Sequence, residues 1–198
     1  MASSLSNFER LLQLGASQNF RTTASRESID WFKNRARQIT NINATALMRR
    51  GANNLKNVPT VGQMYMFYYD PKLKKELPYY DTFPLIFPIN HDGGGFLGIN
   101  LHYLPPMLRA RLMDALYGYI SDLNMDEKTR LNISYNILRG VSKLRYFKPC
   151  IKYYLISHLR SQFLWVDPKE WNLTLFLPTE RFKKATKDKV HRDSRKMI

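Results

Sequence analysis

Three Asp-x-Lys triplets come closest to the pattern of a metal-dependent nuclease, and they begin at Asp70, Asp126 and Asp167. Such an enzyme holds a divalent cation with carboxylates beside a lysine. In a chain this rich in lysine the triplet also arises by chance. At Asp70 and Asp167 a proline follows the aspartate, which favours a turn at the end of a strand or helix. We therefore predict turns rather than metal sites at these positions.

A second candidate set consists of His91 and His102, which flank a predicted hairpin, with Asn100 between them. A small nuclease could use such a set, but it would need a helix with a further ligand directly afterwards. Pro105 and Pro106 follow instead, and two prolines do not continue a helix. We expect His102 to be a hydrogen-bonded structural histidine.

Other signatures of catalysis are not visible in the sequence. Gly93, Gly94 and Gly95 precede Phe96 rather than Lys-Ser or Lys-Thr, so a hairpin turn is favoured over a phosphate-binding loop. A single cysteine, Cys150, and four histidines do not supply zinc ligand pairs. Cys150 is expected to be a buried small hydrophobe, and a lone cysteine indicates a reducing compartment or the inside of a particle. We predict a protein that is not an enzyme and has no metal and no cofactor.

The charge balance is the feature that departs most from an ordinary globular protein. The chain has 31 Lys and Arg residues against 16 Asp and Glu residues, a net charge of +15 at pH 7. Residues 1–60 and 181–198 carry most of this excess, whereas residues 61–180 are nearly balanced. A field of this sign attracts polyanions such as DNA, RNA or an anionic membrane surface. Basic tails can also simply keep a chain in solution, but two cationic ends around a near-neutral middle favour a polyanion partner.

We expect no membrane partner. No apolar stretch approaches the roughly 18 residues that a membrane span needs. The first residues, Met1 to Ser6, show no cationic start before an apolar run, so we expect no secretory signal.

Aromatic residues accompany the lysines in the middle of the chain. Aromatic rings stack on the bases of single strands and frayed ends, while lysines neutralise the phosphates. Tyr79 and Tyr80 lie in the loop that carries three lysines, so a base-stacking role stays open for both. The candidate DNA-binding residues are Arg26, Lys33, Arg37, Arg49, Arg50, Lys72, Lys74, Lys75, Tyr79, Tyr80, Arg181, Lys183, Lys184, Lys187, Arg192 and Arg195.

The elements that must position these residues begin with a helix. Ser25 is a good N-cap, and apolar residues recur at helical spacing after it. The apolar stripe is Ile29, Phe32, Ala36 and Ile39, and another face carries Arg26, Lys33 and Arg37. Residues 40–60 are rich in Asn and predict a linker or a short helix followed by a loop.

Strands are predicted over residues 61–69, 83–89 and 96–104, with a turn at 92–95. In the first strand Tyr65, Phe67 and Tyr69 share one face, and Met64, Met66 and Tyr68 share the other. We expect both faces to be core. In the second strand Pro84 and Pro88 leave two missing N–H groups on the same side, which predicts an edge strand.

Helical spacing follows Pro105-Pro106. One apolar stripe runs through Leu108, Leu112, Ala115 and Tyr119, and a second through Leu131, Tyr135, Leu138 and Ser142. A third helix is expected from Pro149, with Ile151, Leu155, His158 and Leu159 inward. Residues 171–177 then predict a last strand that returns to the sheet.

The predicted fold is α+β: a small antiparallel SH3-like sheet or barrel (61–104 and 171–178) with a helical insertion (106–163) and basic terminal arms. The predicted division is a basic N-terminal arm with one or two helices (1–60), a core domain (61–180) and a basic C-terminal tail (181–198). The tail has few large apolar residues, so we expect it to be ordered by neighbouring molecules rather than by its own core.

Several longer motifs resemble a block found in small proteins of T-even-type tailed bacteriophages. The motifs are Gly62–Pro71, Leu77–Asp81, Phe83–Leu85 and Gly98–Pro105, with similar flanks at Asp30–Phe32, Arg145–Pro149 and Arg181–Lys184. Over most of its length the chain is similar to the DNA end protectors of these phages, head-completion components that cap the terminus of the packaged genome. The resemblance carries over no catalytic residue.

Together these observations predict a non-enzymatic DNA-binding virion protein that caps or protects the packaged DNA terminus at the head–tail junction. The resemblance implies synthesis in the host cytoplasm, neighbouring virion subunits as further partners, and a large assembly. Two alternatives stay open. One is a purely structural neck, tail or baseplate subunit whose basic arms bind neighbouring subunits. The other is a metal-dependent DNA-end nuclease, which a tight cluster of Asp70, Asp81 and Asp167 with a lysine would favour.

Overall fold

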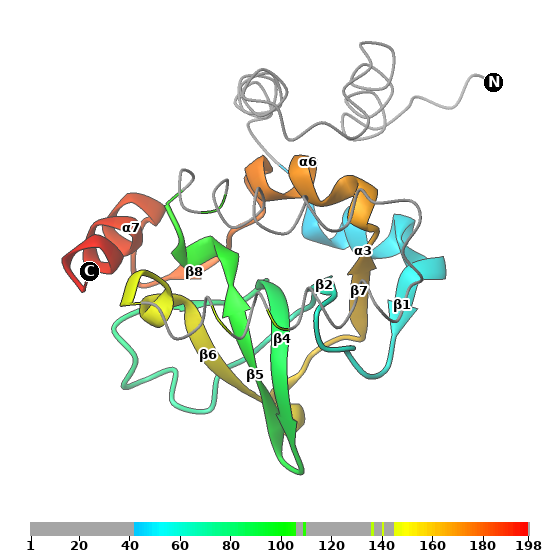
Figure 1. Cartoon of the computed structure of the whole chain (residues 1–198), viewed down its shortest axis with the longest axis horizontal. Coiled ribbons are helices and arrows are strands. Elements are labelled where there is room, and N and C mark those ends of the chain that lie inside the picture. The colour runs from blue at the N-terminus through cyan, green and yellow to red at the C-terminus, as the bar shows by residue number, and fades with distance from the viewer. Residues whose placement is uncertain (1–41, 106–108, 110–135, 137–139, 141–144, 198) are drawn as a thin grey trace.

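The computed structural model describes residues 42–105, 109, 136, 140 and 145–197. Within these residues, antiparallel strands form a six-stranded sheet in the order β1-β7-β2-β4-β5-β6 (Figure 1). The strands are β1 Leu55–Lys56, β2 Met64–Met66, β4 Leu85–Asp92, β5 Gly95–Asn100, β6 Ile151–Leu155 and β7 Phe163–Val166. A separate ribbon pairs β3 (Tyr80–Asp81) with β8 (Phe182–Lys183).

Short helices surround this sheet. The α-helices of the described part are α3 Ala44–Arg50, α6 Trp171–Phe176 and α7 Lys187–Lys196, and the 3-10 helices are η1 Ala52–Asn54, η2 Leu101–Tyr103, η3 Arg145–Cys150, η4 Ile156–His158 and η5 Pro168–Glu170. The mainly antiparallel sheet with a few helices confirms the predicted α+β class. In the described ranges, no helix is long and apolar enough to cross a bilayer.

Both faces of the central sheet are covered, as predicted from strand β2. Met64 and Met66 belong to a core cluster that also contains Trp171 and Val190 from helices α6 and α7. Tyr65 and Phe67 belong to a second, aromatic cluster on the other face. Because successive residues of a strand point to opposite faces, a strand buried on both sides has a continuous apolar sequence instead of an alternating one.

The aromatic cluster joins side chains from β2, β5, β6 and β7 on one face of the sheet. The Phe67 ring lies 5.3 Å from the Tyr154 ring of β6 and 4.9 Å from the Phe163 ring of β7, measured between centroids. Beyond β6 the chain passes the segment that follows β2, where Tyr69 and Leu159 form an isolated antiparallel bridge. The described strands nevertheless form no closed barrel. The SH3-like form of the fold stays a prediction.

Strand β4 corrects the expected edge strand. It lies between β2 and β5, pairing Ile86 with Tyr65 on one side and with Asn100 on the other. The strand tolerates its prolines in another way. Pro84 precedes the strand, and Pro88 lies where the register with β5 shifts, a β-bulge that interrupts the ladder locally. The hairpin turn that joins β4 to β5 at Gly93-Gly94 is as predicted.

The helix predicted from Pro149 is a strand instead. Residues Ile151–Leu155 form β6, which pairs with β5 along its whole length from Ile99↔Ile151 to Gly95↔Leu155. The predicted inward positions fit a helix, but the pairing partner β5 decides in favour of a strand. Cys150 is buried as expected, and burial raises the pKa of its thiol to about 12. The two helices predicted before it, at 108–119 and 131–142, lie outside the described residues apart from isolated positions.

The last predicted strand, residues 171–177, is a helix. Helix α6 buries Trp171 and Leu175, which are four residues apart, on the core. The Trp171 indole N–H donates to the Val166 carbonyl at 2.9 Å. Residue spacings of two and four are both present in this segment, so its pattern fits either element. The buried position of Trp171 beside Phe87, with ring centroids 4.9 Å apart, selects the helical turn.

The C-terminal segment packs on its own chain, so the expectation that external contacts order it was wrong. Helix α7 begins after Thr186, whose hydroxyl accepts from Lys189 N at 3.3 Å. One face of the helix is buried, with Val190 fully inaccessible and His191 7% exposed. The sequence contains few apolar residues here, but Val190 belongs to the main core cluster and Phe182 and Ala185 pack against it. Strand β8 adds a short ladder with β3.

Residues 42–60 form the short helix and loop that were predicted, together with an unexpected strand. Asn43 caps α3, its side-chain oxygen accepting from Thr45 N at 2.9 Å and Ala46 N at 3.3 Å. Strand β1 pairs Leu55 with Leu164 of β7. The helix predicted after Ser25 lies outside the described residues. The division of the chain at residues 60 and 180 stays a prediction, although β1 and β8 both pair with strands of the middle segment.

Candidate nucleic-acid interface

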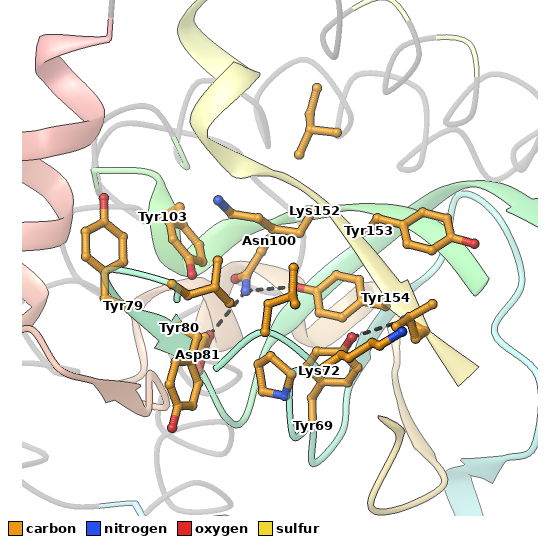
Figure 2. Close-up of a pocket in the computed structure, with 15 residues that line it drawn as sticks. Tyr69, Lys72, Tyr79, Tyr80, Asp81, Asn100, Tyr103, Lys152, Tyr153 and Tyr154 are labelled. Atoms are coloured by element: carbon orange, nitrogen blue, oxygen red, sulfur yellow. Dashed lines mark hydrogen bonds between the residues drawn. The ribbon is translucent and has the colours of Figure 1, made fainter. Parts of the chain in front are cut away.

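A pocket of about 390 Å³ opens beside strand β6. Its walls come from β3 and the loop before it, from β5 and η2, and from every residue of β6 (Figure 2). The lining residues are Tyr69, Pro71, Lys72, Leu73, Leu77, Tyr79, Tyr80, Asp81, Asn100, Tyr103, Ile151, Lys152, Tyr153, Tyr154 and Leu155. Tyrosine is the commonest type among them, so we call this site the tyrosine pocket.

Buried tyrosines form the inner part of the pocket. Tyr69, Tyr103 and Tyr154 are each 7% exposed or less. Their hydroxyls are held in place: Tyr69 accepts from Leu155 N at 3.1 Å, and Tyr154 accepts from the Asn100 amide at 3.0 Å. Burial raises the pKa of Tyr154 well above its usual value and also raises that of Tyr103. These tyrosines are therefore neutral, rigid rings at ordinary pH.

More accessible rings form the rim. Tyr79 and Tyr80 are half-buried, and Tyr153 is 43% exposed. In Figure 2, Tyr79 and Tyr153 lie at opposite sides of the pocket, with Lys152 between them. Tyr153 donates to the Asp92 carboxylate at 2.5 Å, which fixes that ring beside the β4–β5 turn.

Lys152 is the more buried of the two lysines that line the pocket. The Lys152 ammonium lies 4.2 Å from the centroid of the Tyr103 ring, a cation–π contact. Burial lowers the pKa of Lys152, because a charged ammonium loses solvation there. No carboxylate of the described residues forms an ion pair with it. An anion that approached the pocket would therefore find an uncompensated donor.

Behind the pocket a buried polar network connects the wall to the C-terminal segment. The Asn100 amide donates to Asp81 Oδ2 at 3.3 Å, and the same oxygen accepts from His102 Nδ1 at 2.6 Å. On its other side, His102 Nε2 lies 3.0 Å from Thr179 Oγ1. His102 is thus the hydrogen-bonded structural histidine that was predicted.

Asp81, His102 and Thr179 contact one another in the carboxylate–imidazole–hydroxyl order of a catalytic triad. These side chains are closed to substrate. All three residues are at most 4% exposed, and a nucleophile must reach its substrate. Asp70 instead pairs on the surface with Lys74 at 2.9 Å and Arg160 at 3.4 Å. Within the described ranges, no group of three or more His, Cys, Asp or Glu side chains could hold a metal ion.

The structure brings two of the predicted basic segments together. Strand β8 pairs Lys183 with Tyr80, and the Lys184 ammonium donates to the carbonyls of Lys75 and Leu77 at 2.9 and 3.0 Å. Lys184 itself adopts a positive φ of 67°. The C-terminal lysines and the loop with Lys72 therefore lie beside the same pocket.

Other predicted residues lie elsewhere. Arg49 and Arg50 are exposed in the last turn of α3, and the Arg181 guanidinium donates to the Ile42 carbonyl. Helix α7 carries Lys187, 3.5 Å from Glu180, together with the exposed Arg192 and Arg195. Arg26, Lys33 and Arg37 lie outside the described residues.

Sequence reasoning missed the β6 side of the pocket. Lys152, Tyr153 and Tyr154 were placed in a predicted helix, away from Tyr79 and Tyr80. The signal that could have found them is a lysine directly before two tyrosines, the same mixture of residue types that makes the loop before β3 a candidate site.

Aromatic rings beside unpaired lysines are the combination that nucleic-acid sites use to hold bases and phosphates. The chain belongs to the family of the phage T4 terminal DNA protecting protein, whose family model matches residues 6–195. This match confirms the resemblance to phage DNA end protectors. No curated protein and no solved structure matches the chain.

Proposed function

We propose that this chain is a non-enzymatic DNA-binding protein of a tailed-phage particle. It covers the terminus of the packaged DNA at the head–tail junction, and it is made in the host cytoplasm before it joins neighbouring virion subunits. Membership of a terminal DNA protecting family supports the DNA terminus as the target. The observation on this molecule that carries the proposal is the grouping of unpaired lysines around the tyrosine pocket.

Those lysines come from distant parts of the chain. Lys72 and Lys75 belong to the loop before β3, and Lys183 belongs to β8. All three are exposed and form no ion pair within the described residues. A phosphate backbone is the ligand that such a group favours, because each contact releases a condensed counterion.

Two neighbouring lysines already have partners within the chain. Lys74 is held by Asp70, and Lys184 is held by two carbonyls, so we assign them smaller roles in DNA binding. Further proposed contacts, which extend the basic surface away from the pocket, are Arg26, Lys33, Arg37, Arg49, Arg50, Arg181, Lys187, Arg192 and Arg195.

The first experiment measures DNA binding by fluorescence anisotropy between about 50 and 200 mM salt. Engagement of about five phosphates gives a slope of log K against log salt of about −4.5. Lys75→Ala reduces the steepness by about 0.9, whereas the matched Lys56→Ala, in β1 at the opposite end of the sheet order, leaves it unchanged. A DNA affinity that does not change with salt concentration would contradict the proposal and favour the purely structural neck, tail or baseplate subunit.

The second experiment tests the terminus. Linear DNA should compete for the protein better than a closed circle of the same sequence, and bound protein should slow digestion of linear DNA by an exonuclease. Equal competition by the circle would remove the end-capping role. Labelling the protein in intact particles should place it at the head–tail junction.

The third experiment tests the non-enzymatic assignment. DNA incubated with the protein and Mg²⁺ or Mn²⁺ should stay intact. Cleavage that disappears in Asp70→Asn, a change at a surface carboxylate, would replace this proposal with the metal-dependent DNA-end nuclease.

A further inference from the structure

We infer that the tyrosine pocket takes the base of an unpaired nucleotide at the DNA terminus, so that the protein binds frayed or overhanging ends in preference to blunt ones. This inference rests on the proposed function and adds the form of DNA that the site recognises. It depends on the size of the pocket, the chemistry of its lining and the position of its free cations.

The size suits a single flat ligand. A volume of about 390 Å³ lies in the lower part of the range of about 300–1,000 Å³ that holds small organic ligands. A base inside a duplex is stacked and paired, and it must be extruded before it can enter a pocket. An unpaired terminal base meets no such obstacle.

The accessible rings of the lining are those of Tyr79, Tyr80 and Tyr153, and few polar groups are free. Asn100 uses its amide N–H groups on Asp81 and Tyr154, and its carbonyl oxygen accepts from His102 N at 3.0 Å. With these groups occupied, Asn100 does not discriminate between base edges. Stacking on rings tolerates every base, so the pocket should accept any terminal nucleotide with little sequence preference.

Two cations line the pocket from different elements, Lys152 from β6 and Lys72 from the loop before β3. Lys152 reaches the inner wall above the Tyr103 ring, and Lys72 lines the same pocket from the facing loop. Phosphates on either side of an inserted base would meet these two ammonium groups, which have no carboxylate partner within the described residues. This combination of rings within and ammonium groups beside them distinguishes a base site from a patch that binds only the backbone.

The test uses the full chain and two hairpin DNAs that differ only at the end, one blunt and one with a three-nucleotide overhang. The terminal overhang base is 2-aminopurine, whose fluorescence falls when it stacks. We expect quenching on binding and about tenfold tighter binding of the overhang DNA. Tyr79→Ala should remove most of that tenfold preference, while Tyr79→Phe, which keeps the ring, should change it less than twofold.

A second variant keeps the test decisive if Tyr79→Ala does not fold. Tyr153→Ala alters a 43% exposed ring on the other side of the pocket, and it should also reduce the preference for the overhang. Equal affinity for both DNAs with no quenching would overturn the inference but leave the proposed function intact, provided binding stays salt-dependent and end-specific. Absence of DNA binding at low salt would overturn both.

Discussion

The Nδ1 atom of His102 lies 2.6 Å from Oδ2 of Asp81, and both side chains are almost completely inaccessible. Because a carboxylate oxygen accepts, His102 donates at Nδ1. Asp81 also accepts from the backbone N–H groups of Phe83 at 3.1 Å and Arg181 at 3.2 Å. The Asp81 carboxylate therefore connects β3 to the end of β5, to η2 and to the C-terminal segment.

Asp81→Asn should destabilise the fold by about 3 kcal/mol. The new amide group presents a donor where Asp81 now only accepts, so buried donors are left without a partner. Urea unfolding measures the change. Glu76→Gln makes the same chemical exchange at an exposed position and should stay within about 0.5 kcal/mol. Equal stability of Asp81→Asn and the wild-type protein would contradict this role.

Val190→Ala should cost about 2 kcal/mol, because Val190 is fully buried in the main core cluster and its truncation leaves a cavity. Unfolding monitored by near-UV circular dichroism gives the value. Lys196→Ala, on the exposed side of the same helix, serves as the control and should be almost neutral. A neutral Val190→Ala would restore the idea that α7 is an arm ordered only by partners.

Gly95→Ala should destabilise by about 2 kcal/mol, and Gly93→Ala should be neutral or slightly stabilising. A Cβ at Gly95 would lie 2.3 Å from the Tyr154 carbonyl and 2.8 Å from the Tyr153 ring, whereas a Cβ at Gly93 meets nothing within 4 Å. The first is overpacking against backbone; the second only restricts the unfolded chain. Thermal unfolding of the two variants should differ clearly, and similar melting temperatures would count against the close packing of β5 on β6.

Acid should destabilise the protein in two stages. Burial is the main cause that lowers the pKa of His191, so its stabilising contribution is present above the unfolded value of about 6.5 and falls as pH drops below it. Burial alone would raise the pKa of Glu180, but interactions with His102, Arg109 and Lys187 outweigh it and lower the pKa to about 2.

Glu180 therefore contributes stability that is fully present above its unfolded pKa of about 4.5 and is lost as pH falls toward 2, up to about 3 kcal/mol. Urea unfolding at intervals between pH 7 and pH 2 would follow both stages. Glu180→Gln should flatten the lower stage only, and Glu76→Gln should leave both unchanged. An unaltered lower stage in Glu180→Gln would exclude this assignment.

The parts of the fold that could be predicted from the sequence are those with strong local signals. Asp92 followed by glycines indicates a tight turn, and its carboxylate does accept from Gly94 N and Gly95 N at 3.0 and 2.9 Å. The unbroken apolar run around Tyr65 indicates a strand covered on both faces. In each case residues close in sequence determine the outcome.

Segments whose pattern fits two periods could not be assigned in this way. Ile151 and Leu155 are compatible with one helical turn and with alternate positions of a strand, and only the distant partner strand β5 decides between them. Trp171 and Leu175 present the same ambiguity, resolved in the opposite direction by packing on Phe87. For that reason the candidate DNA-binding residues include Tyr79 and Tyr80 but not Lys152, Tyr153 and Tyr154 of β6.

Two long-range contacts determine when the pocket forms during synthesis of the chain. They are the pairing of Tyr80 with Lys183 and the contact of His102 with Thr179. The first joins residues about a hundred positions apart, and the second joins residues nearly eighty positions apart. Such long-range contacts form late in folding. A nascent chain that has left the ribosome only as far as β7 has the central strands but lacks the segment that secures the pocket rim. The pocket is therefore completed only after β8 and α7 have been synthesised, so that an incomplete chain has no finished site with which to bind DNA.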